Sequence, residues 1–178
     1  MIAGVIALAL VLAVGPGCAG GDGDGGGGTR QDYVAALVDA SSEAEGGTLT
    51  ADQETCFAEA IVDAVGVERL ADEVSPDEIR EEGNTSVVDL GVEVDESDGA
   101  AYYESVSQCA DLRAVLVQSE VGTAEITDAA TACFERNLTD DLIRELFETG
   151  FTRTRAELAD DTDLVGRLEA VFTECAAQ

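Results

Sequence analysis

A cysteine-bearing helical pattern that occurs twice constrains the fold of this chain more than any other feature. The first copy, LTADQETCFAEAIVDAVGVERL, and the second, ITDAATACFERNLTDDLIREL, both begin with an aliphatic residue and Thr, and both contain a Cys-Phe pair, at Cys56 and at Cys133. Each copy is followed by a later amphipathic segment with one more cysteine, Cys109 or Cys175. The pattern predicts a helical unit duplicated once. Chance similarity between two amphipathic helices is the alternative.

Apolar residues recur at helical spacing along most of the chain after Arg30, which predicts an all-α domain. Helix start signals are clearest at Thr50-x-x-Gln53 and at Ser75-Pro76-Asp77-Glu78, where a capping residue is followed three residues later by Gln or Glu. The stretch 85–98 alternates loosely like a strand, but no partner strand is evident, so we expect an extended loop or a short isolated strand there. The expected helices are 30–42, one within 49–66 that opens with Thr50, a short one from Pro76 to about Glu82, 100–118, 127–149 and 162–176.

The N-terminal part has a different composition from the rest. Ile2 to Val14 are uncharged and mostly apolar, a run that suits the hydrophobic region of a signal peptide and is shorter than the roughly 20 residues of a membrane-spanning helix. Ala19 to Thr29 are rich in Gly and Asp and have few apolar side chains to bury, which predicts a disordered linker. We therefore expect a signal peptide at 1–17, a linker at 18–29 and one compact domain at 30–178. Its two repeats are expected at 30–122 and 123–178.

The residues Gly15, Pro16, Gly17 and Cys18 at the end of the apolar run resemble the lipobox of bacterial lipoproteins, in which the signal is cut just before a cysteine that carries a diacylglycerol. The match departs from the family at Gly15, where an aliphatic residue is usual, and in the lack of Lys or Arg after the first residue. The resemblance implies that Cys18 is lipidated and that an acyl anchor holds the protein at the outer face of the cytoplasmic membrane. The alternative is an ordinary secretory signal and a secreted protein.

The four cysteines after Cys18 predict two disulfides, because the compartment outside the cytoplasmic membrane permits them. The repeat favours the pairs Cys56–Cys109 and Cys133–Cys175, although pairing across the two copies would also respect the symmetry. Each bridge would close a loop of roughly fifty residues and stabilise the fold by about 4 kcal/mol in the chain-entropy model. The chain has no Cys-x-x-Cys pair and no His, which argues against a zinc site or an activated thiol.

The charge and residue types restrict the function. Thirty-eight acidic residues face nine basic residues, all Arg, and the net charge of −29 argues against nucleic-acid partners. Without His or Lys, the commonest general base and Schiff-base chemistry are absent. The acidic clusters at 95–98 and 160–163 lack the layout of a calcium loop, and the second is expected to cap the last helix. We therefore predict no catalytic residue, no metal site and no cofactor.

The leading hypothesis is a non-enzymatic binding or structural module of the cell envelope, with an envelope protein or a cell-wall component as partner. One alternative is an extracytoplasmic hydrolase that uses two facing carboxylates of raised pKa. Another is a small-molecule-binding lipoprotein, which would need an apolar cavity between the two halves. Five of the arginines are concentrated in the second half and are expected to pair with surrounding acids: Arg136, Arg144, Arg153, Arg155 and Arg167.

Overall fold

The structure, a computed structural model, describes residues 28–42, 49–122 and 126–178. Every regular element in these ranges is a helix, which confirms the predicted all-α class. The predicted signal peptide, Cys18 and all of the linker before Gly28 lie outside the described residues. The helices are α1 (Arg30–Ser42), α2 (Ala51–Val65), α3 (Val67–Glu73), α4 (Pro76–Glu82), α5 (Glu96–Cys109), α6 (Leu112–Val121), α7 (Asp128–Asn137), α8 (Asp140–Thr152), α9 (Arg155–Asp160) and α10 (Thr162–Ala176).

The capping signals in the sequence set the helix starts where they were expected. Thr50 and Gln53 form a reciprocal capping box at α2, and Ser75 and Glu78 form another at α4, with Pro76 at the first helical position. Each box satisfies backbone N–H groups that the first turn of a helix leaves without partners. The Asp161 side chain accepts from the backbone N–H of Leu164, so the acidic cluster before α10 caps that helix as predicted.

Two helices expected to be continuous are each divided. The predicted helix 100–118 is wrong, because Asp111 accepts from the backbone N–H groups of Arg113 and Ala114 and starts α6 anew. The predicted helix 127–149 divides at Leu138, because the hydroxyl of Thr139 accepts from the N–H of Leu142 and caps α8. In both places a short polar side chain competes for the backbone N–H groups and begins a second helix.

The region 85–98 forms no strand in the described chain. Its first part consists of turns and extended backbone, and residues 96–98 belong to α5. The Val87 and Val92 side chains point into the core and are almost fully buried. Burial of these side chains from a loop explains why apolar and polar residues alternate in the segment although it has no strand partner. The helix α9, which the periodicity did not predict, has six residues and begins with a capping box formed by Thr154 and Glu157.

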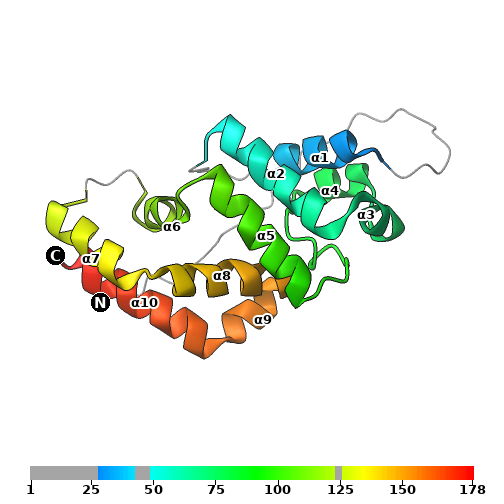
Figure 1. Ribbon diagram of the computed structural model, residues 1–178. Coiled ribbons are helices and arrows are strands. Elements are labelled where there is room, and N and C mark those ends of the chain that lie inside the picture. The colour runs from blue at the N-terminus through cyan, green and yellow to red at the C-terminus, as the bar shows by residue number, and fades with distance from the viewer. Residues whose placement is uncertain (1–27, 43–48, 123–125) are drawn as a thin grey trace.

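The core has two parts that meet along α5. One contains α1, α2, α3, α4 and the loop with Val87, and the other contains α7, α8, α10 and the buried residues Val106 and Leu112. Figure 1 shows α1, α3 and α4 at one end of the molecule, α7 and α10 at the other, and α2, α5 and α8 between them. α5 packs against both α2 and α8, and Tyr102 contacts both parts of the core. This central crossing is where the candidate site lies.

The close crossing of α5 and α8 depends on Gly99, which is buried. A Cβ atom added at this position would lie 2.9 Å from Cγ2 of Thr152 and 3.0 Å from the carbonyl oxygen of Glu148. Carbon atoms in ordinary contact lie about 3.5–4.0 Å apart, so only a glycine fits without movement of α8. Gly99 thus fixes how closely the first and second predicted repeats approach.

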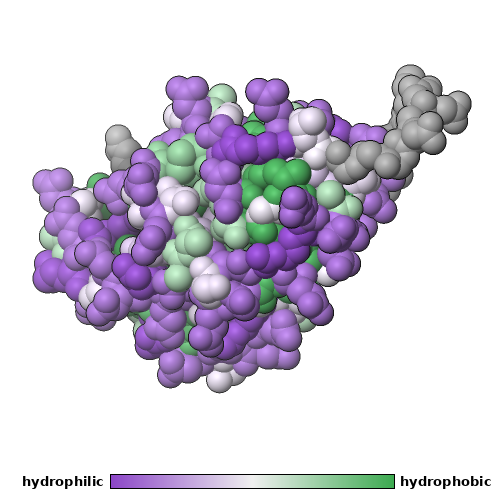
Figure 2. Space-filling model, turned by 45° about the vertical axis from the view of Figure 1, so that its right-hand side comes forward, coloured by the Kyte–Doolittle hydropathy of each residue, from purple (hydrophilic) through white to green (hydrophobic). Residues whose placement is uncertain are grey.

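Outside the core the surface is mainly hydrophilic. Figure 2 shows polar and charged residues over most of one face, with apolar residues reaching the surface in small patches. No helix in the described ranges is long and apolar enough to cross a membrane. The duplication itself stays a prediction, although each half contains one disulfide between two of its helices, α2 and α5 in the first and α7 and α10 in the second.

Candidate functional site

The cysteines after Cys18 form two disulfides, as predicted. One bridge joins Cys56 of α2 to Cys109 of α5, and the other joins Cys133 of α7 to Cys175 of α10. The Cα atoms lie 5.7 Å and 5.3 Å apart, and these are the two pairs that the repeat favours. The bridges link helices within each half. They are typical of an oxidising compartment outside the cytoplasm.

The acidic clusters are used for capping and ion pairing. The Asp95 carboxylate accepts from Ser97 and from the backbone N–H of Asp98, and these hydrogen bonds lower its pKa. Asp98, 7% exposed, accepts from Arg69 at 2.5 Å and 3.2 Å. No group of three or more potential ligands within the described ranges could hold a metal ion.

A carboxylate pair suited to acid catalysis would need at least one acid of raised pKa. Among the described acids whose pKa departs from its usual value, each is lowered by hydrogen bonds. The donors are an arginine, a Ser or Thr three residues earlier, or, for Asp95 and Asp161, groups in the first turn of the helix that the acid itself caps. Hydrogen bonding to the charged form has this effect, because it favours the carboxylate over the neutral acid. The acids with lowered pKa are Asp32, Asp63, Glu78, Asp95, Glu157 and Asp161.

A cavity of about 340 Å³ lies at the central crossing, and we call it the central cavity. It is lined by α2, the loop at 85–87, α5 and α6 from the first half, and by α8, Arg153 and α9 from the second. Most of its wall is apolar, and its volume lies at the lower end of the range for small-molecule sites. The lining residues are Ile61, Thr85, Ser86, Val87, Tyr102, Leu116, Leu146, Phe147, Gly150, Phe151, Arg153, Arg155 and Leu158.

Two stacked aromatic rings form part of the wall. The rings of Tyr102 and Phe151 lie 4.3 Å apart between centroids and are inclined by 15°. Burial raises the pKa of the Tyr102 phenol above its usual value, with no hydrogen bond or nearby charge contributing. Gly150 provides open space on the neighbouring turn, since the nearest atom to a Cβ added there is Cδ2 of Leu158 at 3.8 Å. The cavity is therefore apolar inside.

The polar edge of the central cavity is formed by Arg153 and Arg155, on either side of the residue that caps α9. A nitrogen of Arg153 lies 2.7 Å from an oxygen of Asp161. Arg155 donates to the side-chain oxygen of Asn84 at 2.8 Å, and its Nε lies 3.4 Å from Asp89. These contacts come from residues outside the lining and hold both guanidinium groups at the cavity.

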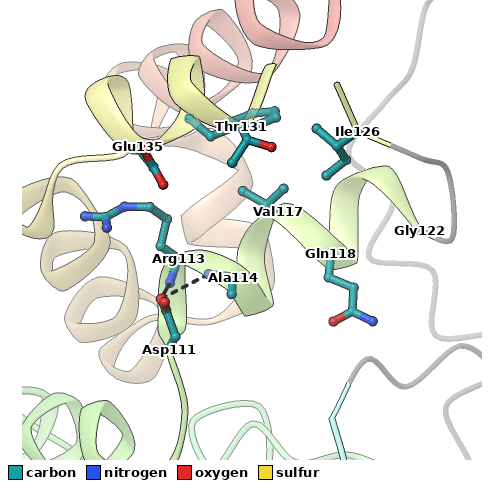
Figure 3. A pocket seen from close by; sticks show the side chains of 10 residues that line it. Asp111, Arg113, Ala114, Val117, Gln118, Gly122, Ile126, Thr131 and Glu135 are labelled. Carbon is teal, nitrogen blue, oxygen red and sulfur yellow. Dashed lines mark hydrogen bonds between the residues drawn. The ribbon is translucent and has the colours of Figure 1, made fainter. Parts of the chain in front are cut away.

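A second pocket, of about 430 Å³, lies between α6 and α7 (Figure 3), and we call it the α6–α7 pocket. Its wall mixes apolar residues such as Val117 with the charged residues Asp111, Arg113 and Glu135. The guanidinium of Arg113 is already engaged, donating to the carbonyl oxygen of Leu138 at 2.8 Å and to Asp140 at 2.6 Å. Part of this wall adjoins residues 123–125, which lie outside the described chain. We therefore base the candidate site on the central cavity.

The helix α6 separates the two spaces. Leu116 lines the central cavity, and its neighbour Val117 lines the α6–α7 pocket, where Figure 3 shows its side chain between those of Arg113 and Ile126. The sequence led us to expect an apolar cavity between the halves only for a small-molecule-binding protein, and none of the wall residues was identified as such. The wall is assembled from five helices and a loop, so no local spacing could have indicated it.

The expected pairing of the second-half arginines is observed for four of them. Arg153 and Arg155 are paired at the central cavity as described, Arg144 lies 3.7 Å from Glu148, and Arg167 pairs with Asp163 and Glu145. No ion pair of the fifth, Arg136, occurs among the described residues.

No protein-family model, curated protein or solved structure matches this chain. The functional assignment therefore depends on the geometry of the site.

Proposed function

We propose that this protein is an exported, non-enzymatic binding protein, anchored at the outer face of the cytoplasmic membrane through Cys18, and that it binds a small apolar molecule in the central cavity. The observation that carries the proposal is the apolar wall contributed by both halves of the chain. Small-molecule binding requires such a space, and a carboxylate-dependent hydrolase would also require acids in its wall, of which this one has none. An envelope protein or a cell-wall component as an additional partner remains compatible with the acidic surface.

The absence of an enzymatic role is part of the proposal. The wall of the central cavity contains no carboxylate, and the described acids with shifted pKa are all lowered, which suits capping and not proton donation at neutral pH. Carboxylates are the main general acids and bases left to a chain without His or Lys. Binding without chemistry is therefore the simplest use of this cavity.

Export and anchoring are supported by two separate features. Both disulfides indicate an oxidising compartment. The lipobox-like sequence ending at Cys18, which lies outside the described residues, suggests attachment by a diacylglycerol. A lipid-anchored protein needs no membrane-spanning helix, since acyl chains supply the membrane affinity.

Calorimetric titration of the full chain with decanol, a neutral apolar probe, tests the binding function. We expect saturable one-to-one binding that is weakened at least about tenfold by Gly150→Leu, because the new side chain would occupy the cavity. The matched control is Gly166→Leu in α10, where an added Cβ meets nothing within 4 Å and the residue is exposed. Absence of decanol binding, or equal binding by both variants, would contradict the proposed function.

Intact-mass analysis of the protein from its native membrane, with and without reduction, tests the anchor and the bridges together. We expect a mature chain that begins at Cys18 and carries diacylglycerol, and a mass gain on reduction that corresponds to two disulfides. A Cys18→Ser variant should lose the lipid and leave both bridges intact. A native mature form that lacks Cys18 would overturn the anchoring proposal and leave the binding function to be judged by the titration.

A further inference from the structure

The charges that line the central cavity differ in sign from those of the rest of the protein. The chain has 38 acidic and nine basic residues, yet the cavity wall contains two arginines and no acid. A wall of this kind offers hydrogen-bond donors to an anion and contains no carboxylate of its own, since the acids that pair with the two arginines lie outside the lining. Acidic residues outnumber basic ones about fourfold in the chain, so a charged residue at a random position would usually be an acid. The lining of the central cavity departs from this composition.

The two guanidinium groups are held in place and still have donors to offer. Each arginine has five N–H donors. The closest contacts use a terminal nitrogen of Arg153 toward Asp161 and a terminal nitrogen of Arg155 toward Asn84, with Nε of Arg155 near Asp89. Each guanidinium therefore has N–H donors beyond those that these contacts use. Groups that are ordered before binding lose less entropy on binding.

The neighbouring acids limit how the arginines act. Asp161 and Asp89 balance the two positive charges, and both arginine side chains are more than a third exposed. Attraction of an anion from a distance is therefore weak, and the net charge of −29 opposes it. Recognition depends on short-range, charge-assisted hydrogen bonds, which arginine makes to carboxylates in a bidentate geometry.

The remainder of the wall is mostly apolar and would contact an apolar part of the same ligand. Ile61, Leu146 and Phe147 are apolar, and the Tyr102–Phe151 stack adds a flat aromatic surface. Thr85 and Ser86 are hydroxyl residues in the loop after Asn84, whose side chain holds Arg155. A ligand that fits both parts has an apolar chain or ring and one acidic head group.

We infer that the central cavity binds an amphipathic organic anion of the fatty-acid type, with its apolar body against the aromatic and aliphatic wall and its carboxylate at Arg153 and Arg155. This inference rests on the proposed function and adds the chemical class of the ligand. A neutral apolar molecule would satisfy the proposed function without satisfying this inference.

Calorimetric titration of the full chain compares decanoate with decanol and decylamine, which share the apolar chain and differ in the head group. We expect decanoate to bind roughly tenfold to a hundredfold more tightly than decanol, because charge-assisted hydrogen bonds add to the same apolar contact. Decylamine should bind more weakly than decanoate, because an ammonium group cannot accept hydrogen bonds from the arginines. All three probes are used below the concentrations at which they form micelles.

The variants Arg153→Gln and Arg155→Gln should each lower the affinity for decanoate about tenfold and leave the affinity for decanol unchanged. Unchanged decanol binding also demonstrates that the cavity has kept its shape. The matched control is Arg167→Gln, which removes an arginine of similar exposure that pairs with Glu145 and Asp163 away from the cavity. This control should bind both probes as the original protein does.

The outcomes separate the two proposals. If decanol binds as tightly as decanoate, or if the decanoate affinity does not change in either arginine variant, the anion inference is wrong and the proposed function stands. If decylamine binds most tightly, the inference is also wrong. If none of the three probes binds, the proposed function fails together with the inference.

Discussion

Replacement of Gly99 by Ala tests the helix crossing on which the central cavity depends. The new Cβ would lie 2.9 Å from Cγ2 of Thr152 and 3.0 Å from the carbonyl oxygen of Glu148. The threonine cannot rotate away without loss of its own hydrogen bond, since its hydroxyl donates to the carbonyl oxygen of Glu148 at 2.9 Å. The carbonyl belongs to the backbone of α8 and can move only if the helix moves.

The magnitude follows from two opposing contributions. Overpacking of a close contact costs about 1–3 kcal/mol, and replacement of glycine by alanine within a helix gains up to about 1 kcal/mol. We expect a net loss of about 1–2 kcal/mol in the free energy of unfolding. Gly166→Ala in α10 provides the matched control, because it has the same helical gain and no contact within 4 Å. It should stabilise the protein by up to about 1 kcal/mol.

The assay is urea-induced unfolding of the full chain with both disulfides intact, followed by far-ultraviolet circular dichroism. Thr152→Ser removes the methyl group that a Cβ at position 99 would meet and keeps the hydroxyl, so combining it with Gly99→Ala should recover part of the loss in a double-mutant cycle. If Gly99→Ala stabilises the protein as much as Gly166→Ala does, α5 and α8 are not as close as described, and the reasoning about the crossing is refuted.

Two further predictions concern a disulfide bridge and a helix-capping box. Replacing Cys56 and Cys109 together by Ala should lower the unfolding free energy by about 4 kcal/mol in the chain-entropy model, since the bridge spans 53 residues; a loss below about 1 kcal/mol in urea unfolding would argue against this mechanism. The Glu78 carboxyl should titrate below its usual pKa of 4.5 in an NMR experiment, because the backbone N–H and hydroxyl of Ser75 donate to its charged form. The stability it contributes is present above pH 4.5 and is lost as the pH falls through the lower folded-state pKa. Ser75→Ala removes the hydroxyl donor and keeps the backbone N–H, so it should move the pKa only part of the way back toward 4.5, and an unchanged value would show that the hydroxyl does not contribute.

Local signals in the sequence accounted for most helices and their starts. The expected helix 162–176 coincides with α10, and the capping boxes at Thr50 and Ser75 form at the positions that the sequence predicts. The two errors of continuity, at Asp111 and Thr139, occur where apolar periodicity runs on across a polar residue. Side chains on both sides of such a break can still face one core, so periodicity alone does not detect it.

The candidate site was not predictable in the same way. Arg153 and Arg155 were expected to pair with acids, and they do, but nothing near them in the sequence indicated that they line an apolar space. Ile61, Tyr102 and Phe151 come from helices distant in sequence. Their juxtaposition depends on how closely α5 approaches α8, which Gly99 permits.

The sequence by itself determined the helical class, the caps and the number of possible bridges, because hydrophobic periodicity, capping hydrogen bonds and cysteine chemistry act over a few residues. It also contains the lipobox-like segment ending at Cys18, on which the anchoring proposal rests. Only the tertiary structure decided where the halves cross and what space they enclose. That space depends on the distances between packed helices, and many different cores can be built from the same amphipathic helices.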